Sequence, residues 1–96
     1  MSADWRLEDE TPAPSLTPAL RALWWDAKGD WERAHDEIAH QSGRDAAWAH
    51  AYLHRKEGDR GNARYWYMRA GQPECTSSLA EEWKSITDAL RAGTSP

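Results

Sequence analysis

The sequence predicts an all-α fold made of two tandem antiparallel helical hairpins and a further helix that caps the C-terminal end. Apolar residues recur at the i, i+3, i+4, i+7 spacing of one helical face. Residues that favour the start or the end of a helix separate these stretches, and the alternation typical of strands is absent. The helices are expected over residues 18–28, 31–41, 46–57, 60–70 and 78–92.

The first predicted hairpin has a start signal and two stop signals. Thr17 is a favourable N-cap, and Pro18 follows at the first helical position, where its missing N–H costs nothing. Gly29 is expected to end this helix and Asp30 to cap the next one. Gly43 is expected to end the second helix.

The second predicted hairpin and the last helix carry the same kinds of signal. Asp45 is expected to cap the third helix, while Gly58 ends it and Asp59 caps the fourth. Ser78, followed three residues later by Glu81, has the pattern of a capping box at the start of the last helix.

The chain is short enough to form one domain, which we place at residues 16–93. Residues 1–15 are acidic, contain prolines and show little periodicity, so we expect a largely extended tail. Trp5 and Leu7 are exceptions to this pattern and could hold the tail against the domain. The seven Trp and three Tyr of the chain are large enough to supply much of a small core.

Composition argues against several classes of partner. The formal net charge of −4 disfavours nucleic acid, which requires clustered Lys and Arg. No apolar run reaches the length of a membrane span and no signal peptide is recognised, so we expect a cytoplasmic protein without a membrane partner. With Cys75 as the single cysteine, the chain has no intrachain disulfide and no cysteine-based metal site.

The two hairpins are related by an internal repeat. Gly58-Asp59 follows Gly29-Asp30 at a shift of 29 residues. The same shift aligns small residues, which let two helices approach closely; the aligned pairs are Ala22 with Ala51 and Ala34 with Ala63.

This pattern resembles the tetratricopeptide repeat and its Sel1-like relatives over residues 18–73. The turn glycine, the small residues and the aromatic of that family fall in this chain at Ala51, Gly58, Asp59, Ala63, Tyr67 and Ala70. The chain departs from the family in its shorter period and in the early Pro73. The strings Asp45–Trp48 and Asn62–Tyr67 also resemble a group of small uncharacterised microbial proteins.

The resemblance implies a binding groove lined by the first helix of each hairpin. The groove positions are Leu23, Asp26, Trp48, Tyr52 and Arg55. Aromatic anchors beside an arginine suit a peptide or a partner protein, including a second copy of the chain in a homo-oligomer. The alternative is a structural or self-associating unit in which the last helix, residues 78–92, fills this groove.

A second alternative is metal binding through histidine. His50 and His54 are four residues apart on one helical face, a spacing that lets two imidazoles share an ion. A third ligand could come from His35 or Asp26, and the competing interpretation is that both histidines pack between helices. We expect neither an enzyme nor a cofactor, because no phosphate-binding glycine loop is present and nothing marks Cys75 as a nucleophile.

Overall fold

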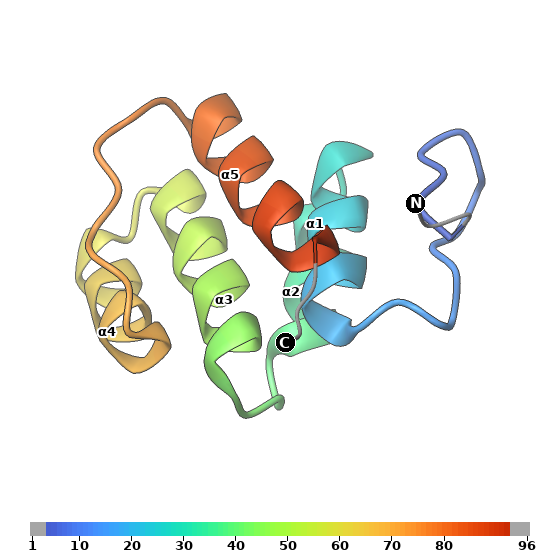
Figure 1. The fold of residues 1–96 in the computed structure, drawn as a ribbon. Helices are drawn as coiled ribbons and strands as arrows, with labels where there is room; N and C mark the ends of the chain where they lie inside the picture. The colour runs from blue at the N-terminus through green and yellow to red at the C-terminus, as the bar shows by residue number, and fades with distance from the viewer. Residues whose placement is uncertain (1–3, 93–96) are drawn as a thin grey trace.

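The computed structural model describes residues 4–92, and this part of the chain contains five helices and no strand (Figure 1). The all-α prediction is therefore confirmed. None of these helices combines the length and the apolar character needed to cross a membrane. The helices are α1 (Pro18–Ala27), α2 (Trp31–Ile38), α3 (Arg44–Glu57), α4 (Arg60–Ala70) and α5 (Leu79–Arg91).

Most helix starts form as the local sequence predicts. The side chains of Thr17, Asp30 and Asp59 each accept a hydrogen bond from the backbone N–H three residues further on. Ser78 and Glu81 form the reciprocal bonds of a capping box at the start of α5. Each of these contacts satisfies a backbone donor that has no partner inside the helix.

The connection between α2 and α3 differs from the prediction. Helix α2 ends at Ile38, three residues early, in a turn closed by the bond from Gln41 N to Ile38 O (3.1 Å). Gly43 does not end α2; with a φ of 102° it is the N-cap residue of α3. Asp45 therefore lies inside the first turn of α3 and does not cap the helix. Its negative charge there interacts favourably with the helix dipole.

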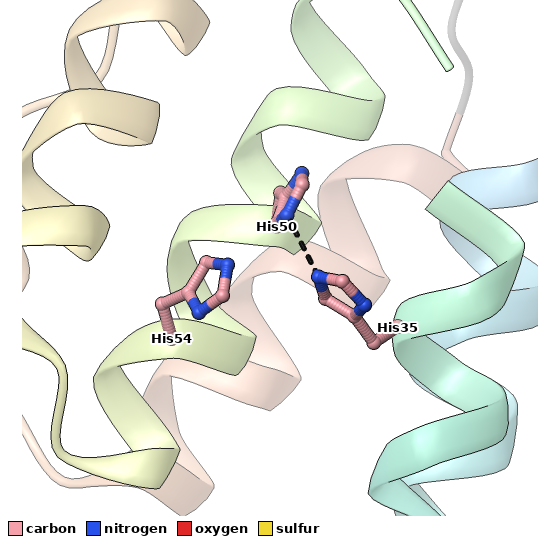
Figure 2. A group of neighbouring side chains, drawn as sticks. All are labelled: His35, His50 and His54. Atoms are coloured by element: carbon pink, nitrogen blue, oxygen red, sulfur yellow. Dashed lines mark hydrogen bonds between the residues drawn. The ribbon is translucent and has the colours of Figure 1, made fainter. Parts of the chain in front are cut away.

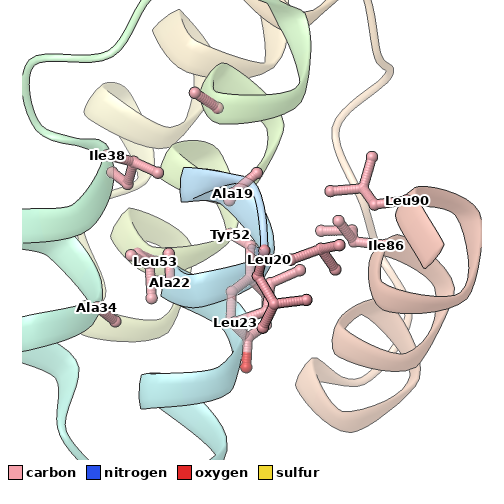
Figure 3. Close-up of a cluster of buried hydrophobic side chains, with 13 residues drawn as sticks. Ala19, Leu20, Ala22, Leu23, Ala34, Ile38, Tyr52, Leu53, Ile86 and Leu90 are labelled. Carbon is pink, nitrogen blue, oxygen red and sulfur yellow. The ribbon is translucent and has the colours of Figure 1, made fainter. Parts of the chain in front are cut away.

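Helix α3 is the central element of the fold. It contacts each of the other four helices, and α5 packs against α1 and α3. Figure 3 shows Ile86 and Leu90 reaching from α5 toward Leu20 and Leu23 of α1, where they form part of the main hydrophobic core. Burial of this apolar surface provides the main stabilisation of the fold.

The N-terminal segment, residues 4–15, is not simply extended but forms turns against the helices. The Trp5 ring lies 6.2 Å from the Trp83 ring of α5, as expected of an anchoring residue. Lys28 Nζ donates a hydrogen bond to Leu7 O at 2.7 Å. The segment is therefore held by its backbone as well as by Trp5.

Indole N–H groups connect segments that are distant in the sequence. Four of them donate hydrogen bonds across the fold: Trp24 to Arg6 O (3.0 Å), Trp25 to Glu37 Oε2 (3.2 Å), Trp31 to Leu53 O (2.8 Å) and Trp83 to Leu23 O (2.9 Å). Three of the acceptors are backbone carbonyls. These tryptophans therefore combine apolar packing with directional contacts between elements.

Replacing Ala63 with leucine is expected to lower the free energy of unfolding by about 1–3 kcal/mol, because added methylenes overpack a filled contact. Ala63 is 3% exposed and packs with Ala51 and Tyr67 between α3 and α4. Denaturant unfolding monitored by circular dichroism measures the change. Ala89→Leu, on the exposed side of α5, is the control and should have little effect. Equal stability of the two variants would mean that the Ala63 contact is not tight.

Candidate metal centre

Three histidines from two helices come together beside the α2–α3 interface (Figure 2). His35 extends from α2 toward His50 and His54, which lie on successive turns of α3. One potential ligand atom from each residue lies within 4.8 Å of those of the other two. Of the two third ligands that the sequence allowed, the structure brings His35, not Asp26, to this pair.

The spacing between His35 and His50 is close to that of two ligands on one ion. Their Nε2 atoms are 3.1 Å apart, and their rings meet edge to face at 4.9 Å. In a tetrahedral zinc site with bonds of about 2.0–2.1 Å, ligand nitrogens lie about 3.3 Å apart. The distance between these two nitrogens is therefore compatible with a shared metal ion.

His54 is oriented by a carboxylate. Its Nδ1 atom lies 2.6 Å from Glu57 Oε2, one turn further along α3. A proton on Nδ1 makes this contact a hydrogen bond and leaves the lone pair on Nε2, the second ring nitrogen. A carboxylate bound to the far nitrogen of a histidine is the usual outer partner of a metal-bound imidazole.

Two indole rings cover the faces of the other imidazoles. The Trp31 ring is stacked on His35 at 5.0 Å, with 7° between the planes. The Trp66 ring of α4 is stacked on His50 at 3.9 Å, with 15° between the planes. These contacts restrict ring rotation, so the histidines are partly preorganised by the packing around them.

Burial favours the uncharged form of His35 and His50 near neutral pH. His50 is 4% exposed, and burial, with smaller contributions from His54 and His35, lowers its pKa to about 4. Burial and the neighbouring His54 also lower the pKa of His35. A charged imidazole is disfavoured at both positions because it loses hydration and would be repelled by any charge on a neighbouring imidazole. The neutral form is also the one that binds metals.

Acidification in the presence of a chelator is expected to destabilise the fold by about 2 kcal/mol between pH 6.5 and pH 4. Because the pKa of His50 is lower in the folded state, the unfolded chain binds protons first, and the stabilisation present above pH 6.5 is lost as the pH falls toward 4. Urea unfolding at several pH values measures this. His50→Gln should reduce the loss, whereas the exposed His40→Gln should not. If the stability of the parent, of His50→Gln and of His40→Gln depends on pH in the same way, the lowered pKa of His50 is not the cause of the loss.

The residues predicted to line a groove are all at least partly buried. Leu23 and Tyr52 are 0% and 2% exposed, and Asp26 is also buried. Trp48 and Arg55 are half-buried. The last helix packs against the face formed by α1 and α3.

Two buried carboxylates organise the polar contacts of this face. Asp26 accepts hydrogen bonds from Tyr52 Oη and from Lys56 Nζ, each at 2.7 Å. Glu82 of α5 accepts one from Arg55 Nη1 at 2.8 Å and another from Tyr67 Oη.

The role of Glu82 was not predicted, although its position carries a signal. Glu82 follows Leu79 by three residues and precedes Ile86 by four, so it stands on the apolar face of α5. A charged residue on such a face needs a buried partner. Burial, followed by the hydrogen bond to Glu82, raises the pKa of Tyr67, which therefore acts as a donor.

An opening remains beside the covered face. It has a volume of about 470 Å³ and lies between the N-terminal segment, α1, α3 and α5. Its walls include two of the predicted groove residues, Asp26 and Tyr52. The other lining residues are Leu7, Ala27, Lys56, Leu79, Ala80 and Trp83.

Comparison with known proteins gives no family assignment. No family model matches the chain, and neither a curated protein nor a solved structure matches it. Its function must therefore be inferred from the residues and contacts described above.

Proposed function

We propose that this protein binds a divalent transition-metal ion, of which zinc is the best candidate, through His35, His50 and His54. The observation that carries the proposal is the convergence of three imidazoles within 4.8 Å. Imidazole nitrogen suits Zn²⁺, Cu²⁺ and Ni²⁺ better than it suits Mg²⁺ or Ca²⁺. The Glu57 carboxylate on His54 supplies the outer contact that such a site uses.

Binding of the ion would link α2 to the helix that follows it, α3. His35 belongs to α2, which is only 8 residues long, whereas His50 and His54 belong to the central α3. Isolated helices of this length are unstable, so α2 depends on tertiary contacts. A metal that requires all three ligands would favour the folded chain over the unfolded chain.

Isothermal titration of chelator-treated protein with zinc tests the proposal. We expect one ion per chain for the parent protein and loss of this binding in His35→Ala. Glu57→Gln should bind about 10–100-fold more weakly, the usual cost of losing an outer-shell partner. His40→Ala, which changes an exposed histidine near α2, is the matched control. Absence of zinc binding by the parent, or unchanged binding by folded His35→Ala, would refute this function.

As a second function, we propose that a peptide segment of a partner protein docks in the opening beside α5. This proposal includes the tetratricopeptide-like hairpin arrangement, which is supported by the packing of α1 on α2 and of α3 on α4 across Gly-Asp turns. The walls of the opening are mainly apolar, and Lys56 at its side uses one of its three donors on Asp26. An apolar side chain next to a carboxylate is the peptide chemistry that matches this surface.

Selection from a displayed random-peptide library tests the second function. Peptides that bind the parent should share an apolar residue beside an acidic one. Ala80→Trp places a large side chain at the opening and should abolish their binding, whereas Ala89→Trp alters an exposed position of the same helix as a control. Equal binding to the parent and to Ala80→Trp would show that the opening is not the docking site.

A further inference from the structure

We propose that a metal ion held by His35, His50 and His54 keeps one coordination position open and binds a small anion from solution there. The ligand class is a monoanion that donates through a single atom, such as a carboxylate or azide. This inference rests on the proposed metal-binding function and adds an exogenous ligand to the site.

The first argument is the number of protein ligands. Within residues 4–92, no fourth His, Cys, Asp or Glu places a ligand atom within 4.8 Å of all three histidines. The neighbouring carboxylate, Glu57, forms a separate group with His54 and Asp59 and already contacts His54 Nδ1. Zinc favours four ligands, and a site with three protein ligands leaves the fourth position to water or to another molecule.

The second argument is charge. Three neutral imidazoles leave the double positive charge of the ion uncompensated within the first shell. His50 and His54 are 4% and 7% exposed, so water solvates this region poorly, and a buried charge without a partner is costly. The Glu57 carboxylate compensates part of the charge through His54. An anion bound directly to the metal would compensate more of it than a water molecule would.

The third argument is access. His35 is only partly buried, and so are Trp31 and Trp66, the two indoles that stack on the imidazoles. The cluster is therefore open to solvent on the His35 side, whereas His50 and His54 are enclosed. Each indole also occupies the space over one face of its imidazole, which favours a small ligand over a large one.

Cobalt substitution tests this inference, because the visible bands of protein-bound Co²⁺ report its coordination number and its ligands. Chelator-treated protein is loaded with Co²⁺ and then titrated with sodium azide or sodium acetate at constant ionic strength. We expect a saturable shift of the bands with one anion per cobalt. Sodium perchlorate, which coordinates weakly, is the control and should leave the spectrum unchanged.

The outcomes separate this inference from the proposed function. If the parent takes up no Co²⁺ and no Zn²⁺, the metal site itself is wrong. If Co²⁺ binds and its spectrum is the same in azide, acetate and perchlorate, the coordination is closed and the open position is refuted. The Glu57→Gln variant tests whether Glu57 itself occupies the fourth coordination position. If anions change the cobalt spectrum only in this variant, Glu57 is the fourth ligand in the parent protein, and the inference is also overturned.

Discussion

Replacing Glu82 with alanine should lower the free energy of unfolding by about 3 kcal/mol, because it removes the buried acceptor shared by Tyr67 and the half-buried Arg55. The Glu82 side chain is 3% exposed and binds Arg55 of α3 and Tyr67 of α4. Its loss leaves the Tyr67 hydroxyl without its acceptor and leaves Arg55 with the carbonyl of Ser77 but no carboxylate partner. A domain of this size has only about 5–15 kcal/mol of stability, so the variant would lose much of it.

Urea unfolding with circular dichroism detection measures the effect of Glu82→Ala. Glu82→Gln keeps the size of the side chain and one acceptor, so its loss should be smaller. Asp88→Ala is the matched control: it removes a carboxylate from the same helix whose ion pair with Lys84 is exposed, and such pairs contribute about 0–1 kcal/mol. If Glu82→Ala is no less stable than Asp88→Ala, the contacts of Glu82 do not anchor α5.

Zinc should raise the melting temperature of the parent protein by about 10–20 °C when free zinc is 100 times the dissociation constant. Binding to the folded state alone contributes about 2.7 kcal/mol under this condition. In a domain of this size, each kcal/mol shifts the melting temperature by about 4–8 °C. Thermal denaturation with added zinc, and again after addition of excess chelator, measures the difference.

His35→Ala serves as the comparison for the zinc experiment. It should melt at the same temperature with zinc and with chelator, because the remaining pair, His50 and His54, lacks the ligand supplied by α2. His40→Ala should respond as the parent does. A parent melting curve that is indifferent to both zinc and chelator would remove the metal-binding proposal.

The helices could be predicted because their signals are local. Thr17, Asp30, Asp59 and Ser78 act on backbone groups within one turn, so their effect does not depend on the rest of the fold. Asp45 is the exception, because it was expected to cap α3 and does not. The helix begins at Arg44, after Gly43 with its positive φ, and therefore earlier than expected. A side chain that favours a cap can lie inside a helix when the backbone before it already turns.

The histidine cluster could be predicted only in part. His50 and His54 share a helical face by spacing alone, but His35 joins them through the packing of α2 on α3. Spacing along the chain did not distinguish His35 from Asp26, since that choice depends on how two helices are rotated toward each other. Asp26 instead points to Tyr52 and Lys56.

The position of α5 also depends on tertiary packing. Its apolar stripe indicated that one face would be buried, but the sequence left open whether this face would pack into the predicted groove. Leu23 of α1 and Tyr52 of α3 are buried on the face against which α5 packs. The inward position of Glu82 was the sequence feature that could have indicated this partner, because Arg55 and Tyr67 offer the donors it requires.

The hydrogen bonds of the indoles suggest why the chain has seven Trp and no Phe. Phenylalanine could fill much of the same apolar space, but it has no N–H to offer the carbonyls of Arg6, Leu23 and Leu53. Any backbone can supply such a carbonyl, whatever its side chain. A related chain could therefore change the exposed Arg6 without losing the bond from Trp24, whereas Leu23 and Leu53 are also constrained by the core in which their side chains are buried.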